Sequence, residues 1–552
     1  PNPYVMMDFD FNAFKPTANN KWFNTDAKHP FNVFFDMNHE SSYTKKYLDT
    51  VNYYWLNEYK IDGYRYDLSK GFTQVNNPND VNAWGAYDAS RIAILKRMAD
   101  KIRVHTPNAY IILEHFAANN EEKELAEYGM MLWANLNYSY NQNTIGLAAN
   151  SDVSWIYHGT RGWNVPHAIG YMESHDEDRL MFRNLQQGMA FGNYNVKDLN
   201  TALERMKVAS MLFYTIPGPK MLWQFGELGY DISIDQGGRV SPKPVKWDYL
   251  DVPARKKLNR TTESLIKLKT TYPIFSSPDV TLGGFTTLQK QIMLRSLTNF
   301  PSGPAEMNAV IIGNFDVTAK SVAVTFPHTG NWYHYFSGGD IANVTSATAS
   351  MTLEPGEGRI YTDVLLPGPG VELVKYLKPI TPVLLSVTEG NNNISVSWDD
   401  RSSIETGYTL YKRTAGGQFA VLAQLPPNLR FHVDFVGLFP LTEYEYYVEA
   451  NNPYGSSVSQ ILSITTSNNI TGLEDEWRDV RIYPNPTNGM VTIEVPPALA
   501  AASIVVRNAM GQAVGYKQVN ESTLDIRSSP PGLYLVVVTA EGKSRAFKII
   551  KQ

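Results

Sequence analysis

Residues 61–72, IDGYRYDLSKGF, carry a positive and a negative side chain two positions apart. In a strand, residues two apart point to the same face, so Arg65 and Asp67 are predicted to lie side by side at the strand's C-terminal end. A neighbouring guanidinium favours the ionised form of a carboxyl group, and an ionised carboxylate can act as a nucleophile. An ordinary structural ion pair would have the same spacing.

Two further carboxyl groups follow apolar segments later in the chain. Glu114 ends IILEHF, and Asp176 follows His175 in MESHDEDR. Retaining cleavage of a glycosidic bond needs one ionised carboxylate as nucleophile and one protonated carboxylic acid as proton donor. Arg65 is expected to keep Asp67 ionised, whereas the apolar strand behind Glu114 favours its protonated form. A third carboxylate can stabilise the positive charge that grows on the sugar.

The elements around these groups predict how they could meet. Residues 1–270 alternate between helical patterns and short apolar runs, which is typical of parallel βα units. A βα barrel builds its active site at the C-terminal ends of its strands, where all three carboxylates fall. The predicted helices are 45–59, 88–105, 200–216 and 253–272, and the predicted strands are 61–67, 109–116, 128–136, 168–176 and 218–227.

After about residue 273 the pattern changes to short strands separated by Gly, Pro and Asn turns, which predicts antiparallel β domains. Alternation in NISVSWDD and YEYYVEA indicates a second all-β region, and a third follows the polar segment TSNNITGLEDEW. The predicted domains are a catalytic region at 1–272 with an inserted loop domain, and β domains at 273–366, 378–467 and 478–552.

Composition excludes several classes of function. The net charge of −5 and the absence of a long basic run argue against nucleic acid as a partner. The chain contains no cysteine, which excludes disulfides, zinc–thiolate sites and cysteine nucleophiles. No apolar run reaches the length of a membrane-spanning helix.

The motifs, taken in order, resemble the α-amylase family (glycoside hydrolase family 13). DGYRYDLSKGF resembles its second conserved region, IILEHF its third and YMESHDEDR its fourth. TIPGPKMLWQFGELGYD resembles the segment around the eighth barrel strand, and FFDMNHES the short motif in the domain inserted after the third strand. The resemblance spans roughly residues 1–365. It implies Asp67 as nucleophile, Glu114 as general acid/base, Asp176 as transition-state stabiliser, and Arg65, His175 and Lys70 as substrate-binding residues.

The sequence departs from the family pattern in two places. The family often has Lys-His after the nucleophile, where this chain has Lys70-Gly71, so the acceptor side of the cleft is expected to differ. The family's first conserved region has no counterpart. We therefore expect an N-terminally truncated copy of a secreted enzyme that lacks about a third of its barrel, which puts the activity of the isolated chain in question.

The resemblance makes no cofactor certain. Bound Ca²⁺ is common in the family, yet no ligand set can be named from the sequence. His29, Asn32, Asp36 and Asn38 lie in the inserted segment and are predicted mainly to shape its loop. Trp133 and Trp163 lie near the candidate loops, where core packing is the expected role of each.

The last two β regions resemble known modules. Residues 378–467 resemble a fibronectin type III module, with Trp398 in its core and Leu438 and Tyr444 in a corner where the tyrosine hydroxyl bonds to backbone. Residues 480–552, with YPNP, a Gly-Leu-Tyr block and a basic end, resemble the C-terminal sorting domain of the type IX secretion system of Bacteroidetes. This second resemblance implies export by that machinery, followed by release or attachment at the cell surface.

The sequence thus predicts a multidomain protein: an N-terminally incomplete (β/α)8-type barrel, an antiparallel β domain, an immunoglobulin-like β-sandwich and a small C-terminal β-sandwich. The expected function is a secreted glycoside hydrolase that cleaves α-1,4, or α-1,6, glucosidic bonds of starch, glycogen or maltooligosaccharides with retention. A transglycosylase or branching enzyme acting on α-glucans is the alternative within the same chemistry. A non-catalytic glucan-binding surface protein is the alternative outside it, because the barrel is incomplete.

Overall fold

The computed structural model describes residues 3–296, 307–337, 341–369, 373, 378–390, 392–402, 404–468, 480–496, 499, 502–520, 522–540 and 543–552. The chain divides into two compact units, Pro1–Pro369 with Leu373–Lys375 and a second built mainly from Tyr376–Gln552. Residues 370–372 and 374–377, near the predicted boundary between the domains 273–366 and 378–467, lie outside the described residues, as does much of TSNNITGLEDEW.

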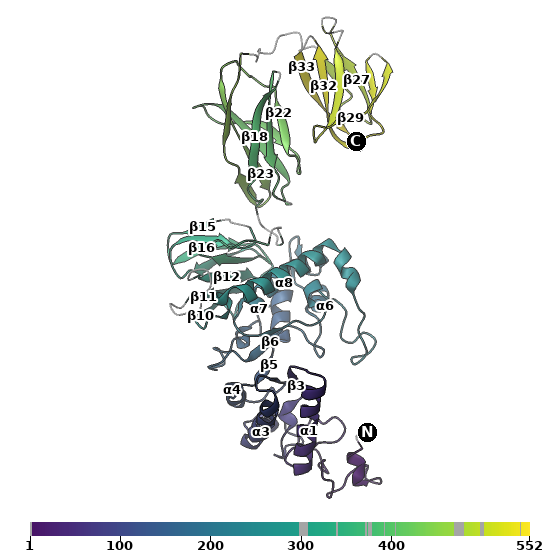
Figure 1. Cartoon of the computed structure of the whole chain (residues 1–552), viewed down its shortest axis with the longest axis vertical. Coiled ribbons are helices and arrows are strands. Elements are labelled where there is room, and N and C mark those ends of the chain that lie inside the picture. Colours follow the sequence, from purple (N-terminus) through teal and green to yellow (C-terminus); the bar gives the residue numbers. More distant parts are fainter. Residues whose placement is uncertain are drawn as a thin grey trace. The chain divides into compact units, whose positions relative to one another are not determined.

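Five parallel strands form the sheet of the first unit (Figure 1). Neighbours in the sheet are also neighbours along the chain, as in a βα barrel. Gly63 lies so close to the next strand that a Cβ would be 2.1 Å from the Tyr110 carbonyl oxygen. In sheet order the strands are β3 (Gly63–Tyr66), β4 (Tyr110–Leu113), β5 (Met131–Asn135), β6 (Ala168–Tyr171) and β9 (Lys220–Met221).

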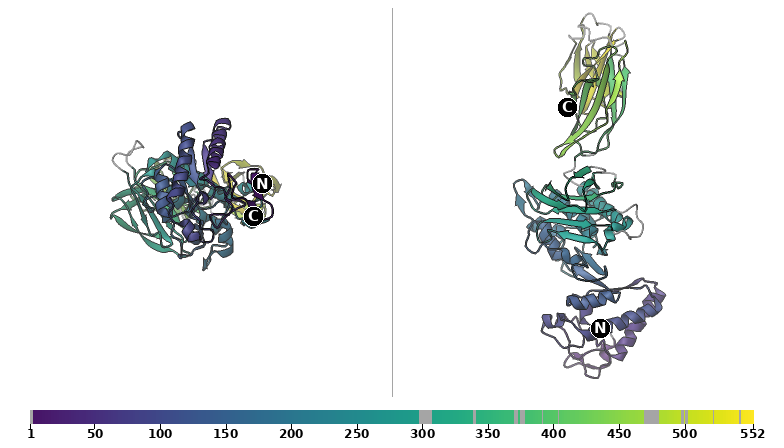
Figure 2. Two further views of the ribbon diagram at one scale, coloured as in Figure 1. Left: turned by 90° about the horizontal axis from the view of Figure 1, so that it is seen from below. Right: turned by 90° about the vertical axis from the view of Figure 1, so that its left-hand side faces the viewer.

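Helices fill the connections between these strands. Asp80, Asp88 and Asp198 accept hydrogen bonds from free backbone N–H groups and so begin three of the helices. α1 packs against α3, and α7 against α8 (Figure 2). The helices are α1 (Ser42–Glu58), α2 (Val81–Gly85), α3 (Ala89–His105), α4 (Asn119–Glu127), α5 (Asn137–Ile145), α6 (Leu180–Gln187), α7 (Leu199–Thr215) and α8 (Pro253–Thr271).

The four helices predicted from the sequence are present, with ends shifted by at most a few residues. The predicted strand 218–227 is wrong in length. Only Lys220–Met221 pair with the sheet, because Phe225 takes a left-handed conformation and leads into a short 3-10 turn. The other short elements are the 3-10 turns Val5–Met7, Ser69–Gly71, Ser154–Ile156, Gly226–Leu228, Trp247–Asp251 and Pro273–Ser276, and the strand pairs β1 (Phe9–Asp10) with β2 (Lys15–Pro16) and β7 (Ala190–Phe191) with β8 (Tyr194–Asn195).

Two antiparallel sheets complete the first unit. The larger has the order β10-β11-β12-β17-β14-β15 and the smaller pairs β13 with β16. α7, buried on nearly all sides, packs against β12 and so joins this domain to the parallel sheet. The strands are β10 (Val280–Gly283), β11 (Gln289–Leu294), β12 (Ala309–Asn314), β13 (Lys320–Thr325), β14 (Gly330–His334), β15 (Ile341–Val344), β16 (Thr348–Leu353) and β17 (Gly358–Thr362).

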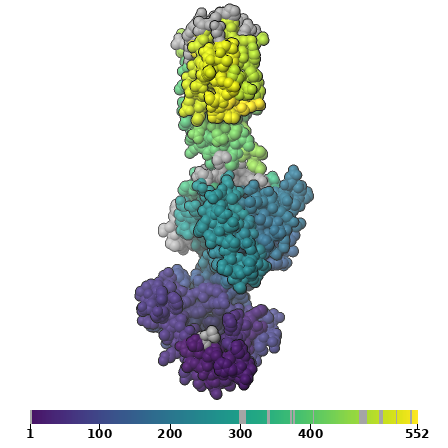
Figure 3. All heavy atoms as spheres, turned by 90° about the vertical axis from the view of Figure 1, so that its right-hand side faces the viewer, coloured from purple at the N-terminus to yellow at the C-terminus, as the bar shows by residue number. Residues whose placement is uncertain are grey.

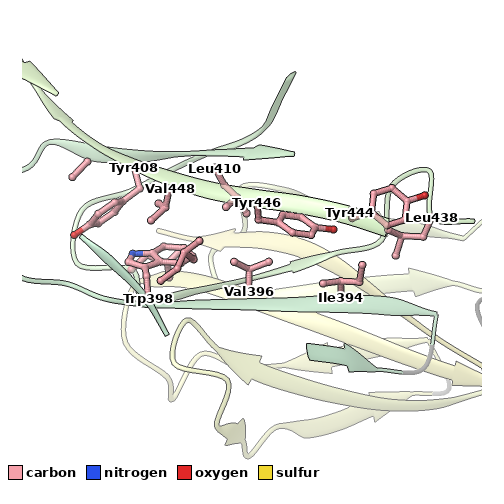
Figure 4. Packing of buried hydrophobic residues seen from close by; sticks show 12 residues of the cluster. Ile394, Val396, Trp398, Tyr408, Leu410, Leu438, Tyr444, Tyr446 and Val448 are labelled. Atoms are coloured by element: carbon pink, nitrogen blue, oxygen red, sulfur yellow. The ribbon is translucent and has the colours of Figure 1, made fainter. Parts of the chain in front are cut away.

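The second unit begins with a two-sheet β-sandwich. Sheet β18-β19-β22 faces sheet β21-β20-β23-β24, and β25 also pairs with β23. Trp398 and the inward side chains of both sheets form its core (Figure 4). The strands are β18 (Val383–Gly390), β19 (Asn393–Asp399), β20 (Gly407–Thr414), β21 (Ala420–Leu425), β22 (Phe431–Asp434), β23 (Glu443–Asn452), β24 (Gly455–Val458) and β25 (Leu462–Thr465).

A smaller pair of sheets ends the chain. Their orders are β26-β27-β31-β30 and β29-β28-β32-β33, and their inward residues form one hydrophobic core. Its surface is coloured yellow in the space-filling view (Figure 3). The strands are β26 (Arg481–Tyr483), β27 (Met490–Glu494), β28 (Ser503–Asn508), β29 (Ala513–Val514), β30 (Lys517–Asn520), β31 (Thr523–Asp525), β32 (Gly532–Ala540) and β33 (Lys543–Lys551).

The predicted tyrosine corner is present in the sandwich. The buried Tyr444 hydroxyl donates to the Gly437 carbonyl and accepts from the Phe439 N–H, both at 2.9 Å. Tyr444→Phe removes both bonds and is expected to destabilise this corner by about 1 kcal/mol. Hydrogen exchange of the Phe439 amide in the full chain should then be faster by roughly fivefold. Unchanged exchange would show that the corner does not depend on the hydroxyl. The assignment to the fibronectin type III family stays a prediction.

Candidate active site

Asp67 and Glu114 lie at the C-terminal ends of the neighbouring strands β3 and β4. The Glu114 N–H donates to the Tyr66 carbonyl at 3.0 Å, so the parallel ladder fixes the two ends beside one another. Arg65 bridges the two carboxyl groups: Nη1 donates to Asp67, and Nη2 lies 2.7 Å from Oε2 of Glu114. The two carboxyl groups also share a hydrogen bond. The predicted convergence of these three side chains is therefore present in the structure.

Burial gives the two carboxyl groups different proton affinities. The Asp67 side chain is 73% exposed and that of Glu114 only 12%. Burial raises the pKa of Glu114 to about 7, an effect that the hydrogen bond with Asp67 reinforces. For Asp67 a smaller burial effect is outweighed by the hydrogen bond with Glu114 and the charge of Arg65, so its pKa is lowered. The pair can therefore supply one ionised carboxylate and one protonated acid near neutral pH.

The backbone after β3 is shaped around Glu114. Leu68 has φ 41°, the left-handed conformation that non-glycine residues seldom adopt. In this conformation its N–H donates to Glu114 Oε2 at 3.2 Å. Phe116 and Phe225, near the ends of β4 and β9, are left-handed as well, with φ of 53° and 60°.

Asp176 and His175 lie in the loop after β6. His175 Nε2 is 3.3 Å from Asp176 Oδ2, and the Arg239 guanidinium donates to the Asp176 carbonyl. The His175 ring lies edge-on to the Trp133 ring, and the Arg65 guanidinium lies over that same ring, so this loop lies near Arg65. The Asp176 side chain is 56% exposed, and its convergence with Asp67 and Glu114 stays a prediction.

Two buried charged side chains hold the loop that carries Asp176. The buried Arg179 guanidinium donates to the carbonyl groups of Ser174 and Glu177 at 2.5 and 2.6 Å. The carboxyl group of Glu173 accepts from the Leu180 N–H at 2.7 Å, and burial raises its pKa to about 7. These bonds fix both ends of the loop without using any side chain that faces solvent.

Trp133 is a residue of the site that the sequence did not assign to it. Its ring lies under the Arg65 guanidinium, 4.2 Å from ring centroid to Cζ, and edge-on to His175 with centroids 6.2 Å apart. A cation over an aromatic face is held by the ring quadrupole, so Trp133 fixes the orientation of Arg65. Only its position in β5, a neighbour of the strands that carry the carboxyl groups, could have indicated this contact. Trp163 is buried and donates to Asn119, which agrees with a packing role.

Lys70 lies away from the carboxyl groups in the described structure. Its side chain is buried, donates to the Phe116 carbonyl at 3.0 Å and lies over the Trp84 ring. At Gly71 a Cβ would be 2.9 Å from Nε2 of His29, so the imidazole of the inserted segment fills the space beside this glycine. A role of Lys70 in substrate binding stays a prediction.

The polar residues of the inserted segment bond to their own loop. Asp36 accepts from the Asn24 amide and the Lys28 N–H and faces His29, and the Asn32 amide donates to the Phe34 carbonyl. Both carboxyl oxygens of Asp36 therefore contact groups of this loop, and Oδ1 of Asn38 accepts from the Glu40 and Ser41 N–H groups. Among the residues that the structure describes, no three His, Asp or Glu side chains are arranged to hold a metal ion.

A family match identifies the end of the chain. Residues 481–552 match the secretion system C-terminal sorting domain family. The last module is a secretion sorting domain. Such a domain of the type IX system implies that the protein is secreted or held at the cell surface. No helix in the described part of the chain has the length and apolar character needed to cross a membrane.

Curated relatives match more than half of the chain. The chain is 20% identical over 349 residues to a 1,4-α-glucan branching enzyme of Aliivibrio fischeri, and 22% identical over 346 residues to one of Xanthomonas axonopodis pv. citri. Each match covers 58% of this chain and 46% of the relative, so the chain spans about half the length of the curated relatives it matches. In this part the chain is similar in sequence to 1,4-α-glucan branching enzymes.

Solved structures of the same kind are similar in part. An α-amylase from Anoxybacillus aligns over 62% of this chain and 71% of its own, with 16% identity and a TM-score of 0.44. A γ-cyclodextrin glucanotransferase from Bacillus clarkii aligns over 97% of this chain and 75% of its own, with 12% identity and a TM-score of 0.45.

Proposed function

We propose that this secreted protein is a retaining glycoside hydrolase that cleaves α-1,4-glucosidic bonds of α-glucans, with α-1,6 bonds as the second linkage. The observation that carries the proposal is the Arg65 bridge between an exposed carboxyl with a lowered pKa and a buried carboxyl with a raised one. This is the division of roles that retaining cleavage requires.

In the proposed reaction Asp67 attacks the anomeric carbon while Glu114 donates its proton to the departing glycosidic oxygen. Glu114, now ionised, takes a proton from water, which attacks the glycosyl–Asp67 bond and releases the sugar. Asp176 faces the developing positive charge on the sugar ring. A retaining pair holds its carboxyl groups roughly 5–5.5 Å apart, so that one can attack the anomeric carbon while the other protonates the departing oxygen.

A branching enzyme is the second candidate, because the curated relatives that the chain matches are 1,4-α-glucan branching enzymes. The covalent step would be the same. The C6 hydroxyl of a second glucan would take the place of water, and the product would carry a new α-1,6 linkage. A protein that binds glucan without turnover is the remaining alternative.

Incubation of the full chain with amylose separates these functions. Hydrolysis raises the number of reducing ends, whereas branching creates α-1,6 linkages, visible by proton NMR, without a matching rise. We expect reducing ends to accumulate. If only new α-1,6 linkages form, the protein is a branching enzyme and the proposal of a hydrolase is wrong. Retention of the chain on an amylose gel without any product would assign it to glucan binding.

A further inference from the structure

A buried hydrogen-bonded ring lies directly beneath the two catalytic carboxyl groups. It joins Ser69, on the loop after β3, to His115, which follows Glu114 after β4. From His115 it continues through Glu121 on α4 to Arg91 on α3, and Arg91 donates back to the Lys70 carbonyl at 3.0 Å. The four side chains that form it are at most 1% exposed.

The ring holds the loop of the proposed nucleophile against the residue that carries the proposed acid. The Ser69 N–H donates to the Glu114 carbonyl at 2.9 Å, and Ser69 Oγ is 2.9 Å from His115 Nδ1. Ser69 is thus held by both its backbone and its side chain. The residue before it, Leu68, is the left-handed one whose N–H reaches the Glu114 carboxyl.

The partners of each group in the ring indicate which atom donates in each hydrogen bond. Arg91 donates to both carboxyl oxygens of Glu121, at 2.6 and 2.7 Å, and these donors keep that carboxyl ionised although it is buried. An ionised carboxylate only accepts, so Nε2 of His115 must carry the hydrogen. Burial lowers the pKa of His115, which favours the neutral ring, and in the neutral ring Nδ1 accepts from the Ser69 hydroxyl. The carbonyl oxygen of Glu114, 3.0 Å from Ser69 Oγ, is a second acceptor for the same hydrogen.

We propose that His115 is a positioning residue for the proposed reaction: fixed by Glu121 and Arg91, it holds Ser69 and thereby sets the placement of the Asp67 loop against Glu114. The proposal rests on the function proposed above. Without the Ser69 hydroxyl bond, Leu68 is free to leave its unfavourable conformation. Its N–H then moves away from Glu114, which loses a donor that stabilises its ionised form.

The test compares Ser69→Ala with Thr73→Val in the full chain. Thr73 is a matched control, because its hydroxyl is also buried but donates to Asp88 at the start of α3. Carbon-13 NMR of glutamate-labelled protein follows the titration of Glu114, which a Glu114→Gln spectrum assigns. We expect the Glu114 midpoint to rise in Ser69→Ala and to stay unchanged in Thr73→Val. His115→Phe, which keeps a ring but loses both nitrogen contacts, should act like Ser69→Ala.

Turnover of amylose gives the second readout. We expect kcat to fall about tenfold in Ser69→Ala, with little change in KM, and to stay near the native value in Thr73→Val. If the titration midpoint of Glu114 is the same in Ser69→Ala and Thr73→Val, the positioning role of His115 is wrong. If the native chain turns over no glucan, the proposed function fails, and the titration of Glu114 still decides the role of His115.

Discussion

Asp67→Asn lowers kcat on amylose by at least about 10⁴-fold and leaves glucan binding intact. The amide that replaces the carboxylate is a poor nucleophile, so no glycosyl–enzyme bond forms. Binding should persist, because the side chain is exposed and its removal leaves the Arg65–Glu114 contact in place. Rates on amylose and retention in amylose gels measure the two effects separately.

Asp62→Asn is the matched control for this change. Asp62 is an exposed residue just before β3, at the end of the strand away from the site. We expect native turnover from this variant. If Asp67→Asn lost binding while turnover survived, Asp67 would be a substrate-binding residue and the assignment of the nucleophile would be wrong.

Glu114→Gln lowers kcat/KM on amylose by about 10²- to 10⁴-fold and removes the high-pH limb of the profile. The acid must be protonated to act, and its pKa is raised to about 7, so activity of the native chain is full below that pH and falls as the pH rises through it. A glutamine cannot titrate, so the residual rate of the variant should be flat across this range. The loss should be smaller on aryl glucosides whose leaving group needs no proton.

Glu173→Gln tests whether the high-pH limb of the activity profile belongs to Glu114. The Glu173 carboxyl also has a pKa raised to about 7 by burial, and it lies beneath the loop that carries Asp176. The high-pH limb should remain in Glu173→Gln and vanish in Glu114→Gln. The opposite result would move the titrating group from the proposed acid to the support of the Asp176 loop.

Much of the fold follows from periodicity. α3 and α7 end within a residue of their predicted bounds, because Asp88 and Asp198 cap regular helical patterns. α5 escaped prediction because its sequence, NYSYNQNTI, has no apolar stripe. Buried asparagines stabilise it instead: Asn143 donates to the Ser139 and Ser151 carbonyl groups, and Asn137 to those of Met172 and Asp178.

The candidate site also contains residues that the sequence could predict and residues that it could not. Arg65, Asp67 and Glu114 could be placed because strand parity and parallel strand ends are local properties that tertiary packing preserves. Trp133 and the Ser69–His115 bond could not, because they depend on contacts between residues far apart in the sequence. Lys70 is close to the site in sequence, but its side chain contacts Trp84 and the Phe116 carbonyl in the interior. Proximity in sequence therefore did not predict its position.

At the left-handed residues near the strand ends, the requirements of thermostability and of catalysis differ. Leu68, Phe116 and Phe225 each hold a backbone conformation that costs a bulky residue about 1–3 kcal/mol. Glycine would relieve that cost, so selection for thermostability alone would favour it at these positions. At Leu68 the looser backbone would no longer aim an N–H at Glu114. Selection for turnover should therefore keep a less stable residue at the point where the chain leaves β3.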